Sequence, residues 1–179
     1  MSKPVVFILL LGLAAIAAGL FGALHNQLSY SVGASYFFDL KFDQFGIAED
    51  ARNRLGAALV GWRASWWMGM LLGLPVFLLG LLLIRKPGHL LAAGIGAMGV
   101  VLFAALLCAM GGLLLGMLAP SLAAGIALPQ GLSDPEGFLR AALMHEGAYL
   151  GGLIGLVAAL WTIWRAARTE RHWREARRS

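Results

Sequence analysis

Two histidines stand where they could bind a metal ion. His25 follows the first long uncharged run of the chain, and His145 lies near the start of the last one, beside Glu146. An ionisable side chain within an apolar span is costly and indicates a functional site by default. Imidazole and carboxylate groups together suit zinc, manganese or iron, and Asp43 adds a second carboxylate. These four residues predict a divalent-metal site, although their spacing matches neither H-E-x-x-H nor H-x-x-x-H.

Three other interpretations of these residues stay open. His25 and His145, on facing helices at one depth, could be the axial ligands of a haem b, although an electron path across a membrane usually needs a second centre. In the plainest interpretation, His145 and Glu146 lie near the interface, where water lowers their cost, and they bind loop backbone. A small polar ligand would instead use the neighbouring polar side chains, which are Asn26, Gln27, Tyr30, Tyr36, Gln44 and Tyr149.

Long uncharged runs identify the chain as a membrane protein. Only 13% of its 179 residues are charged and the mean hydropathy is +0.78, whereas a soluble domain carries roughly 25% charged residues. The length suits one small bundle without a second domain. Cys108 is the only cysteine, which excludes an intramolecular disulfide, a Cys-x-x-Cys redox pair and covalent haem attachment.

The apolar runs predict an all-α fold, a polytopic membrane four-helix bundle in a single domain. We expect membrane spans at about residues 4–25, 63–84, 90–118 and 139–164. Pro120, Pro129 and Gly131 break the second half of a 44-residue uncharged run, so we assign one helix to that run. The first run resembles a signal-peptide core, but its 21 residues exceed the usual length of about 7–15, and we expect a retained helix.

The segment between the first two spans, residues 26–61, is expected to be a structured outer loop. Phe38, Leu40 and Phe42 alternate with charged residues, which suggests an extended strand. Phe38, Phe42 and Phe45 also fit one face of a helix, so both structures stay open. A further apolar series, Ile47, Ala51, Leu55 and Leu59, predicts an amphipathic helix that lies on the membrane or leads into it.

Charge asymmetry orients this bundle. One end carries nine basic residues, which are Lys3, Arg85, Lys86 and the tail residues Arg165, Arg168, Arg171, Arg174, Arg177 and Arg178. The other end carries five, Lys41, Arg52, Arg54, Arg63 and Arg140, together with seven acids. The positive-inside rule therefore places both termini in the cytoplasm and the loops 26–61 and 120–138 outside. The basic tail, residues 165–179, indicates topology and contact with anionic lipids and not nucleic-acid binding.

Glycine spacing predicts close helix contacts. Gly147, Gly151 and Gly155 form two overlapping G-x-x-x-G motifs in the last span, and such motifs let another helix approach closely. We expect a neighbour within the chain, while a homo-oligomer or a larger membrane complex stays open. Gly80 is expected to be less crowded. The G-x-G-x-x-G match at residues 94–99 lies inside an apolar helix, without the strand that dinucleotide binding requires.

One block of the sequence is distinctive as a whole. It comprises Gly22-Ala23-Leu24-His25-Asn26-Gln27, Tyr30, Tyr36-Phe37, Lys41-Phe42 and Gln44-Phe45-Gly46. This block resembles a family of uncharacterised bacterial four-helix integral membrane proteins. The resemblance implies a place in the bacterial inner membrane and no known activity. The family has an acidic residue just before the Tyr-Phe pair, where this chain has Ser35, so one candidate ligand is missing here.

These patterns predict an inner-membrane protein that binds a ligand or a metal ion at its outer polar cluster. Two alternative functions stay open. The first is a haem- or metal-dependent membrane redox protein built on His25 and His145. The second is a subunit of an oligomeric transporter or channel, which is weakened because no charged residue lies in the middle of a span.

Overall fold

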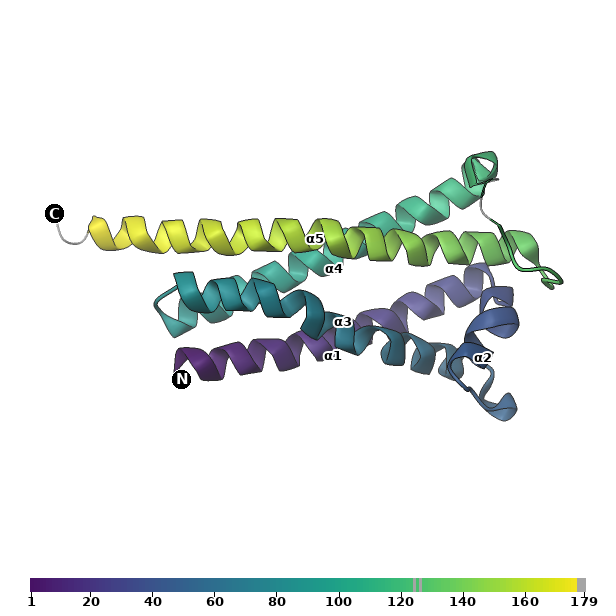
Figure 1. The fold of residues 1–179 in the computed structure, drawn as a ribbon, viewed down its shortest axis with the longest axis horizontal. Helices are drawn as coiled ribbons and strands as arrows, with labels where there is room; N and C mark the ends of the chain where they lie inside the picture. The colour runs from purple at the N-terminus through teal and green to yellow at the C-terminus, as the bar shows by residue number, and fades with distance from the viewer. Residues whose placement is uncertain (124, 126, 177–179) are drawn as a thin grey trace.

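Four long apolar helices make up most of the chain in the computed structural model, which describes residues 1–123, 125 and 127–176 (Figure 1). They are α1 (Lys3–Val32), α3 (Arg54–Leu83), α4 (Pro87–Leu118) and α5 (Pro135–Glu175). Each helix is long and apolar enough to cross a membrane. No strand occurs in the part of the chain that the structure describes. The all-α class and the four apolar helices are therefore confirmed.

The helices run well beyond the predicted spans. Residues 26–32 continue α1 and residues 54–62 already belong to α3, so the expected loop at 26–61 shrinks to residues 33–53. Hydropathy marks only the apolar part of a helix, whereas the polar turns beyond it are held here by contacts between α1 and α3. At the other end of the chain, α5 includes the tail as far as Glu175. Arg177, Arg178 and Ser179, like residues 124 and 126 of the second loop, lie outside the described residues.

Caps and prolines explain where the helices begin. The Asn53 side chain accepts hydrogen bonds from the N–H groups of Leu55 and Gly56, at 2.8 and 3.3 Å. The Asp134 side chain accepts one from the N–H of Gly137 at 3.0 Å. Such side chains satisfy N–H groups that have no partner within the first turn. Pro87 and Pro135 occupy the first turns of α4 and α5, where a missing N–H costs nothing.

Residues 33–53 fold into short helices over one end of the long ones. They are the π-helix η1 (Phe37–Lys41), α2 (Phe42–Gln44) and the 3₁₀-helix η2 (Glu49–Ala51). A further 3₁₀-helix, η3 (Pro120–Ala123), follows α4. The extended alternative for residues 38–43 is therefore wrong, because burying Phe37 and Phe42 against one aromatic cluster requires helical spacing.

The amphipathic helix expected from Ile47 onward is also wrong. Ile47 is buried, but it precedes the helix, and Gly46 reverses the chain just before it with φ +60°. Asn53 starts α3 in a different phase, which leaves Leu55 81% exposed. An apolar period that crosses a turn does not describe one helical face.

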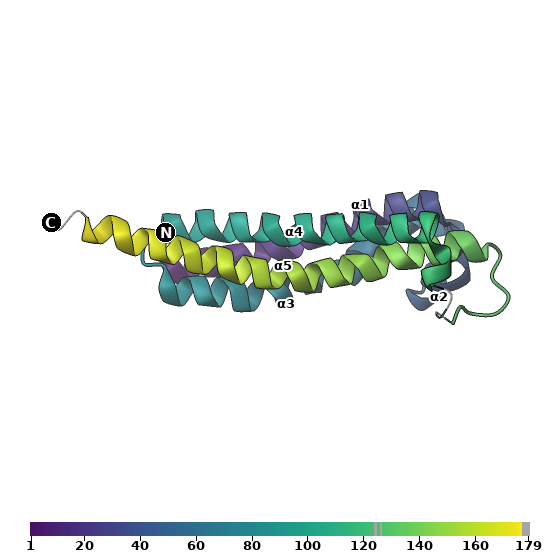
Figure 2. The same cartoon turned by 90° about the horizontal axis from the view of Figure 1, so that it is seen from above.

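The helices pack as two pairs, α1 with α3 and α4 with α5, and the helices of each pair cross (Figure 1). The N-terminus, the α3–α4 turn and the C-terminal part of α5 lie at one end, which we call the terminal end (Figures 1 and 2). Residues 33–53 and the segment between α4 and α5 lie at the opposite end, the loop end. The predicted grouping of these segments at two ends is thus observed.

Small residues let the paired helices touch. A Cβ on Gly151 would lie 2.6 Å from the Cα of Ala105, and one on Gly155 would lie 2.7 Å from the Cα of Val101. A Cβ on Gly147 would meet the backbone of Cys108, which lies in α4 like Ala105 and Val101. The predicted contact at these three glycines is therefore confirmed, and its neighbour is within the chain.

Other glycines have different surroundings. Gly80 is buried, and a Cβ there would lie 2.7 Å from Cδ1 of Leu90, the end of a flexible side chain, whereas a Cβ on Gly151 meets backbone atoms. This difference agrees with the expectation that Gly80 is less crowded than Gly151. The α3–α4 turn brings the first turns of α4 back against Gly80. Within the G-x-G-x-x-G match, Gly94 packs on Leu10 of α1, whereas Gly96 and Gly99 have nothing within 4 Å. Gly94 therefore serves helix packing, whereas Gly96 and Gly99 lie at the surface.

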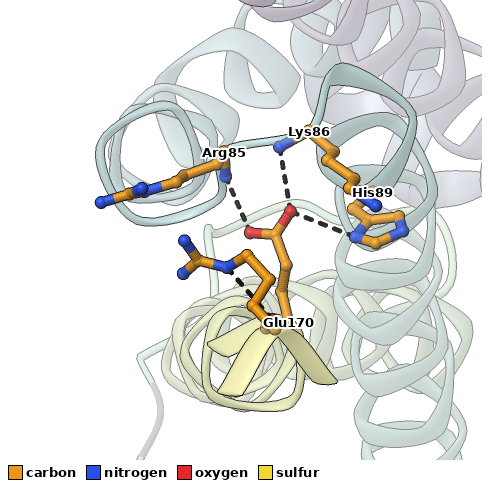
Figure 3. A network of polar contacts seen from close by, with 5 residues as sticks. Arg85, Lys86, His89 and Glu170 are labelled. Atoms are coloured by element: carbon orange, nitrogen blue, oxygen red, sulfur yellow. Dashed lines mark hydrogen bonds and ion pairs between the residues drawn. The ribbon is translucent and has the colours of Figure 1, made fainter. Parts of the chain in front are cut away.

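A buried carboxylate joins α5 to the α3–α4 turn at the terminal end (Figure 3). Glu170 is 4% exposed and accepts hydrogen bonds from the N–H groups of Arg85 at 2.8 Å and Lys86 at 2.9 Å. Nδ1 of His89 lies 3.2 Å from the same carboxylate. A negative charge at the N-terminus of α4 is favoured by the helix dipole, so Glu170 holds three helices in register.

Candidate ligand-binding site

A cavity of about 490 Å³ lies between the two helix pairs and is lined by all four long helices. Along α1 it extends from Ala14 to Asn26, which is about 18 Å at a rise of about 1.5 Å per residue. Its deep part is apolar, with Ala14, Phe77 and Ala97 in the wall. Toward the loop end, its polar lining residues are His25, Asn26, Lys41, Gln44, Arg63, Ser65, His145 and Tyr149.

His25 and His145 meet at this polar end. Their rings contact edge to face, with centroids 4.7 Å apart and planes at 86°, so the two residues do share one depth. His25 is only 5% exposed and stacks on Phe21 with a centroid distance of 5.8 Å. Neither ring nitrogen of His25 has a hydrogen-bond partner among the described residues. An unpaired polar group at this depth costs roughly 1–3 kcal/mol, so His25 is a candidate to bind a ligand.

His145, unlike His25, has a hydrogen-bond partner. Its Nε2 is joined by a hydrogen bond of 3.2 Å to the hydroxyl of Ser29, on α1. Its ring stacks on the buried ring of Tyr36, with centroids 4.7 Å apart. Burial raises the pKa of the Tyr36 phenol, and the nearby Tyr149 and Glu146 raise it further. Tyr36 therefore stays neutral, and its ring packs against the imidazole of His145 and fixes its orientation.

Lys41 and Gln44, from the short helices, line the loop end of the cavity, which we call its mouth. Nζ of Lys41 donates a hydrogen bond of 2.9 Å to the Gln44 side chain and lies 5.3 Å from the centre of the Tyr36 ring. Burial lowers the pKa of Lys41, while the charge of Glu146 acts in the opposite direction. Lys41 closes the π-helix η1, and π-helical turns are frequent at functional sites.

Other predicted ligand residues hold α1 to α3. Nδ2 of Asn26 donates to the carbonyl of Ala57 at 2.8 Å, and Nε2 of Gln27 donates to the carbonyl of Arg54 at 2.9 Å. The guanidinium of Arg54 lies 5.3 Å from the centre of the Tyr30 ring. Asn26 also lines the cavity, whereas Gln27 and Tyr30 do not. These bonds explain why both helices continue past their apolar parts.

The structure does not bring the four predicted metal ligands together. Asp43 pairs with Arg52 at 2.5 Å, because the turn at Gly46 returns the chain beside it. Glu146 is exposed and is not a lining residue. No three His, Cys, Asp or Glu side chains among the described residues are placed to share a metal ion. Among the described residues, the cavity is therefore lined by two imidazoles and by no carboxylate.

The imidazole pair also has the wrong geometry for a shared haem. Two axial ligands bind iron from opposite faces of the macrocycle, which must lie between them. The rings of His25 and His145 are instead in direct contact. The arrangement favours a ligand held by hydrogen bonds beside the two rings.

Three residues of the site were not singled out from the sequence. Ser29 lies one helical turn after His25, and that spacing was the available signal for a shared face. Lys41 and Arg63 both line the cavity, but nothing in their spacing marks either one as a ligand-binding residue. The many small residues in its wall, such as Ala18 and Ala148, leave its space open.

No protein-family model matches the chain, and no curated protein or solved structure matches it. The function must therefore be inferred from the geometry of the site itself.

Proposed function

We propose that this protein is an integral component of the bacterial inner membrane that binds a small amphiphilic ligand in the cavity between its helix pairs. The polar part of the ligand lies beside His25 and His145, and its apolar part extends toward Ala14 and Phe77. The observation that carries this proposal is the buried imidazole of His25, which lines the cavity with no hydrogen-bond partner on either nitrogen among the described residues.

The free-energy cost of burying the unpaired His25 favours a role in ligand binding over a purely structural role. A histidine kept only as a structural residue would bond a neighbouring segment, as His145 on α5 bonds Ser29 on α1. His25 ties no segment, and leaving it unpaired costs roughly 1–3 kcal/mol. A polar atom of a ligand would supply the missing bond and offset this cost.

The dimensions and lining support the same conclusion. Ligand sites usually have volumes of roughly 300–1,000 Å³, with mostly apolar walls and a few convergent polar groups. The cavity, at about 490 Å³, has this volume and this distribution of side chains.

The four apolar helices form an up-and-down bundle in this proposal, with both termini in the cytoplasm. The grouping of Lys3, Arg85 and the arginine-rich end of α5 at the terminal end supports this orientation. The cavity mouth then opens at the outer face. Trp62, Trp66 and Trp67 are exposed near it, as expected of residues at a membrane interface.

Native mass spectrometry of the protein purified in a mild detergent tests the binding function. We expect a bound mass that disappears in Gly152→Leu, because a Cβ at Gly152 meets only Cδ1 of Leu72, at 3.6 Å, and the larger side chain fills the cavity. The matched control Gly99→Leu, at an exposed site with nothing within 4 Å, should keep the mass. A wild-type protein without bound mass, or equal occupancy in both variants, contradicts the proposal.

A further inference from the structure

We infer that the ligand is an anionic amphiphile with an apolar chain, whose head group binds between Lys41 and Arg63. This inference rests on the proposed function and adds the chemical class of the ligand. It follows from the charges at the mouth of the cavity and from the shape of its deep part.

The charged residues that line the cavity are both cationic. They are Lys41 and Arg63, and no carboxylate lines the wall. Neither cation forms an ion pair among the described residues, whereas two other loop-end arginines do: Arg52 with Asp43, and Arg140 with Glu136. Unpaired cations that converge on a cavity attract an anion.

Both cations also have hydrogen-bond donors to spare. Arg63 donates from Nη1 to the carbonyl of Phe45 at 3.3 Å, and Lys41 donates to Gln44. A guanidinium has five N–H donors and an ammonium has three, so each can bind a further acceptor. A carboxylate or phosphate head would accept charge-assisted bonds from both. Glu146 acts on Lys41 electrostatically, but the two lining cations, Lys41 and Arg63, outnumber this one carboxylate, so the head-group position keeps a net positive charge.

The deep part of the cavity suits a hydrocarbon chain. Along α1 its lining runs from Ala14 to Asn26, about 18 Å at a rise of about 1.5 Å per residue. This length accommodates an extended chain whose atoms contact the apolar walls at about 3.5–4.0 Å. A fatty acid and a monoacyl phosphate share this chemistry, and their heads differ.

Quenching of Trp67 fluorescence tests the class of ligand, since Trp67 lines the cavity. A variant that keeps only Trp67 is made by replacing Trp62, Trp66, Trp161, Trp164 and Trp173 with Phe. In lipid nanodiscs, it is titrated with three brominated probes of equal chain length: a fatty acid, a monoacyl phosphate and a long-chain alcohol. We expect saturable quenching, with at least one anionic probe binding about tenfold more tightly than the alcohol. The tighter of the two anionic probes identifies the head group.

Substitution of the cations completes the test. The double variant Lys41→Gln with Arg63→Gln should lose the preference for the anionic probe and bind the alcohol as before. Arg140→Gln removes a loop-end arginine that does not line the cavity, and it should keep the preference.

The outcomes separate the two proposals. If the alcohol binds as tightly as both acids, or if the double variant keeps its preference, the ligand class is wrong and ligand binding stands. If no probe quenches Trp67 saturably while mass spectrometry shows a bound molecule, the class is again wrong. If neither measurement finds a bound molecule, both the ligand class and the proposed function are wrong.

Discussion

The ring of His25 on α1 contacts the ring of His145 on α5, with centroids 4.7 Å apart. The contact joins the two helix pairs at the polar end of the cavity. The two rings differ in one respect, because His145 is bonded to Ser29 and His25 has no hydrogen bond among the described residues. This difference separates a structural imidazole from one that is available to a ligand.

Replacing His25 should separate stability from binding. His25→Phe removes a buried unpaired group and keeps a ring beside Phe21, so the ligand-free protein should gain up to about 1 kcal/mol of stability. The same variant should lose its bound mass. Thermal unfolding of delipidated protein measures the first effect and native mass spectrometry the second.

Ser29→Ala provides the matched control. It removes the partner of His145 from a fully buried position and should lower stability by about 1 kcal/mol. A loss of stability in His25→Phe as large as that in Ser29→Ala would mean that His25 is a structural residue.

The glycine contact between α4 and α5 should not tolerate a side chain. Gly151→Leu places its Cβ 2.6 Å from the Cα of Ala105, so the helices must separate, at a cost of about 1–3 kcal/mol. The melting temperature in detergent should fall by several degrees. Gly99→Leu adds the same side chain at an open position and should change it little, and equal melting temperatures for the two variants would refute the contact.

The buried carboxylate of Glu170 should stabilise the α3–α4 turn. Glu170→Ala leaves the N–H groups of Arg85 and Lys86 without their acceptor, which should cost about 1–3 kcal/mol. Limited tryptic proteolysis after Arg85 should accelerate along with thermal unfolding. The control is Glu175→Ala, which removes an exposed carboxylate on the same helix. If proteolysis of the two variants is alike, Glu170 does not hold the turn.

Reporter fusions test the orientation. Fusions after Asp43, Gly88, Asp134 and Ser179 should report outside, inside, outside and inside, because the basic residues at the terminal end stay in the cytoplasm. An outside signal at Ser179 is incompatible with an even number of crossings and would overturn the topology.

The sequence predicts the parts of this fold that follow from hydropathy and from local spacing. Uncharged runs locate four helices, and the spacing of Gly147, Gly151 and Gly155 locates a helix contact. Helix ends were less predictable, because Asn26 and Gln27 extend α1 through bonds to a helix far along the chain.

The site was predictable only in part. Polar residues at the ends of apolar runs locate His25 and His145, since antiparallel helices bring such ends to one depth. Asp43 was wrongly grouped with them because the turn at Gly46 directs its carboxylate to Arg52. The cavity itself is made by small residues on four helices, and no local pattern reports their convergence.

Nitrogen-15 NMR of histidine side chains tests the central claim most directly. Protein labelled at histidine is compared as purified and after the bound mass has been removed by detergent exchange, with His25 assigned from His25→Phe. A ligand that bonds the unpaired imidazole should shift a His25 ring-nitrogen signal and leave those of His89 and His172, at the terminal end, unchanged. Loss of the bound mass without any change at His25 would contradict the account.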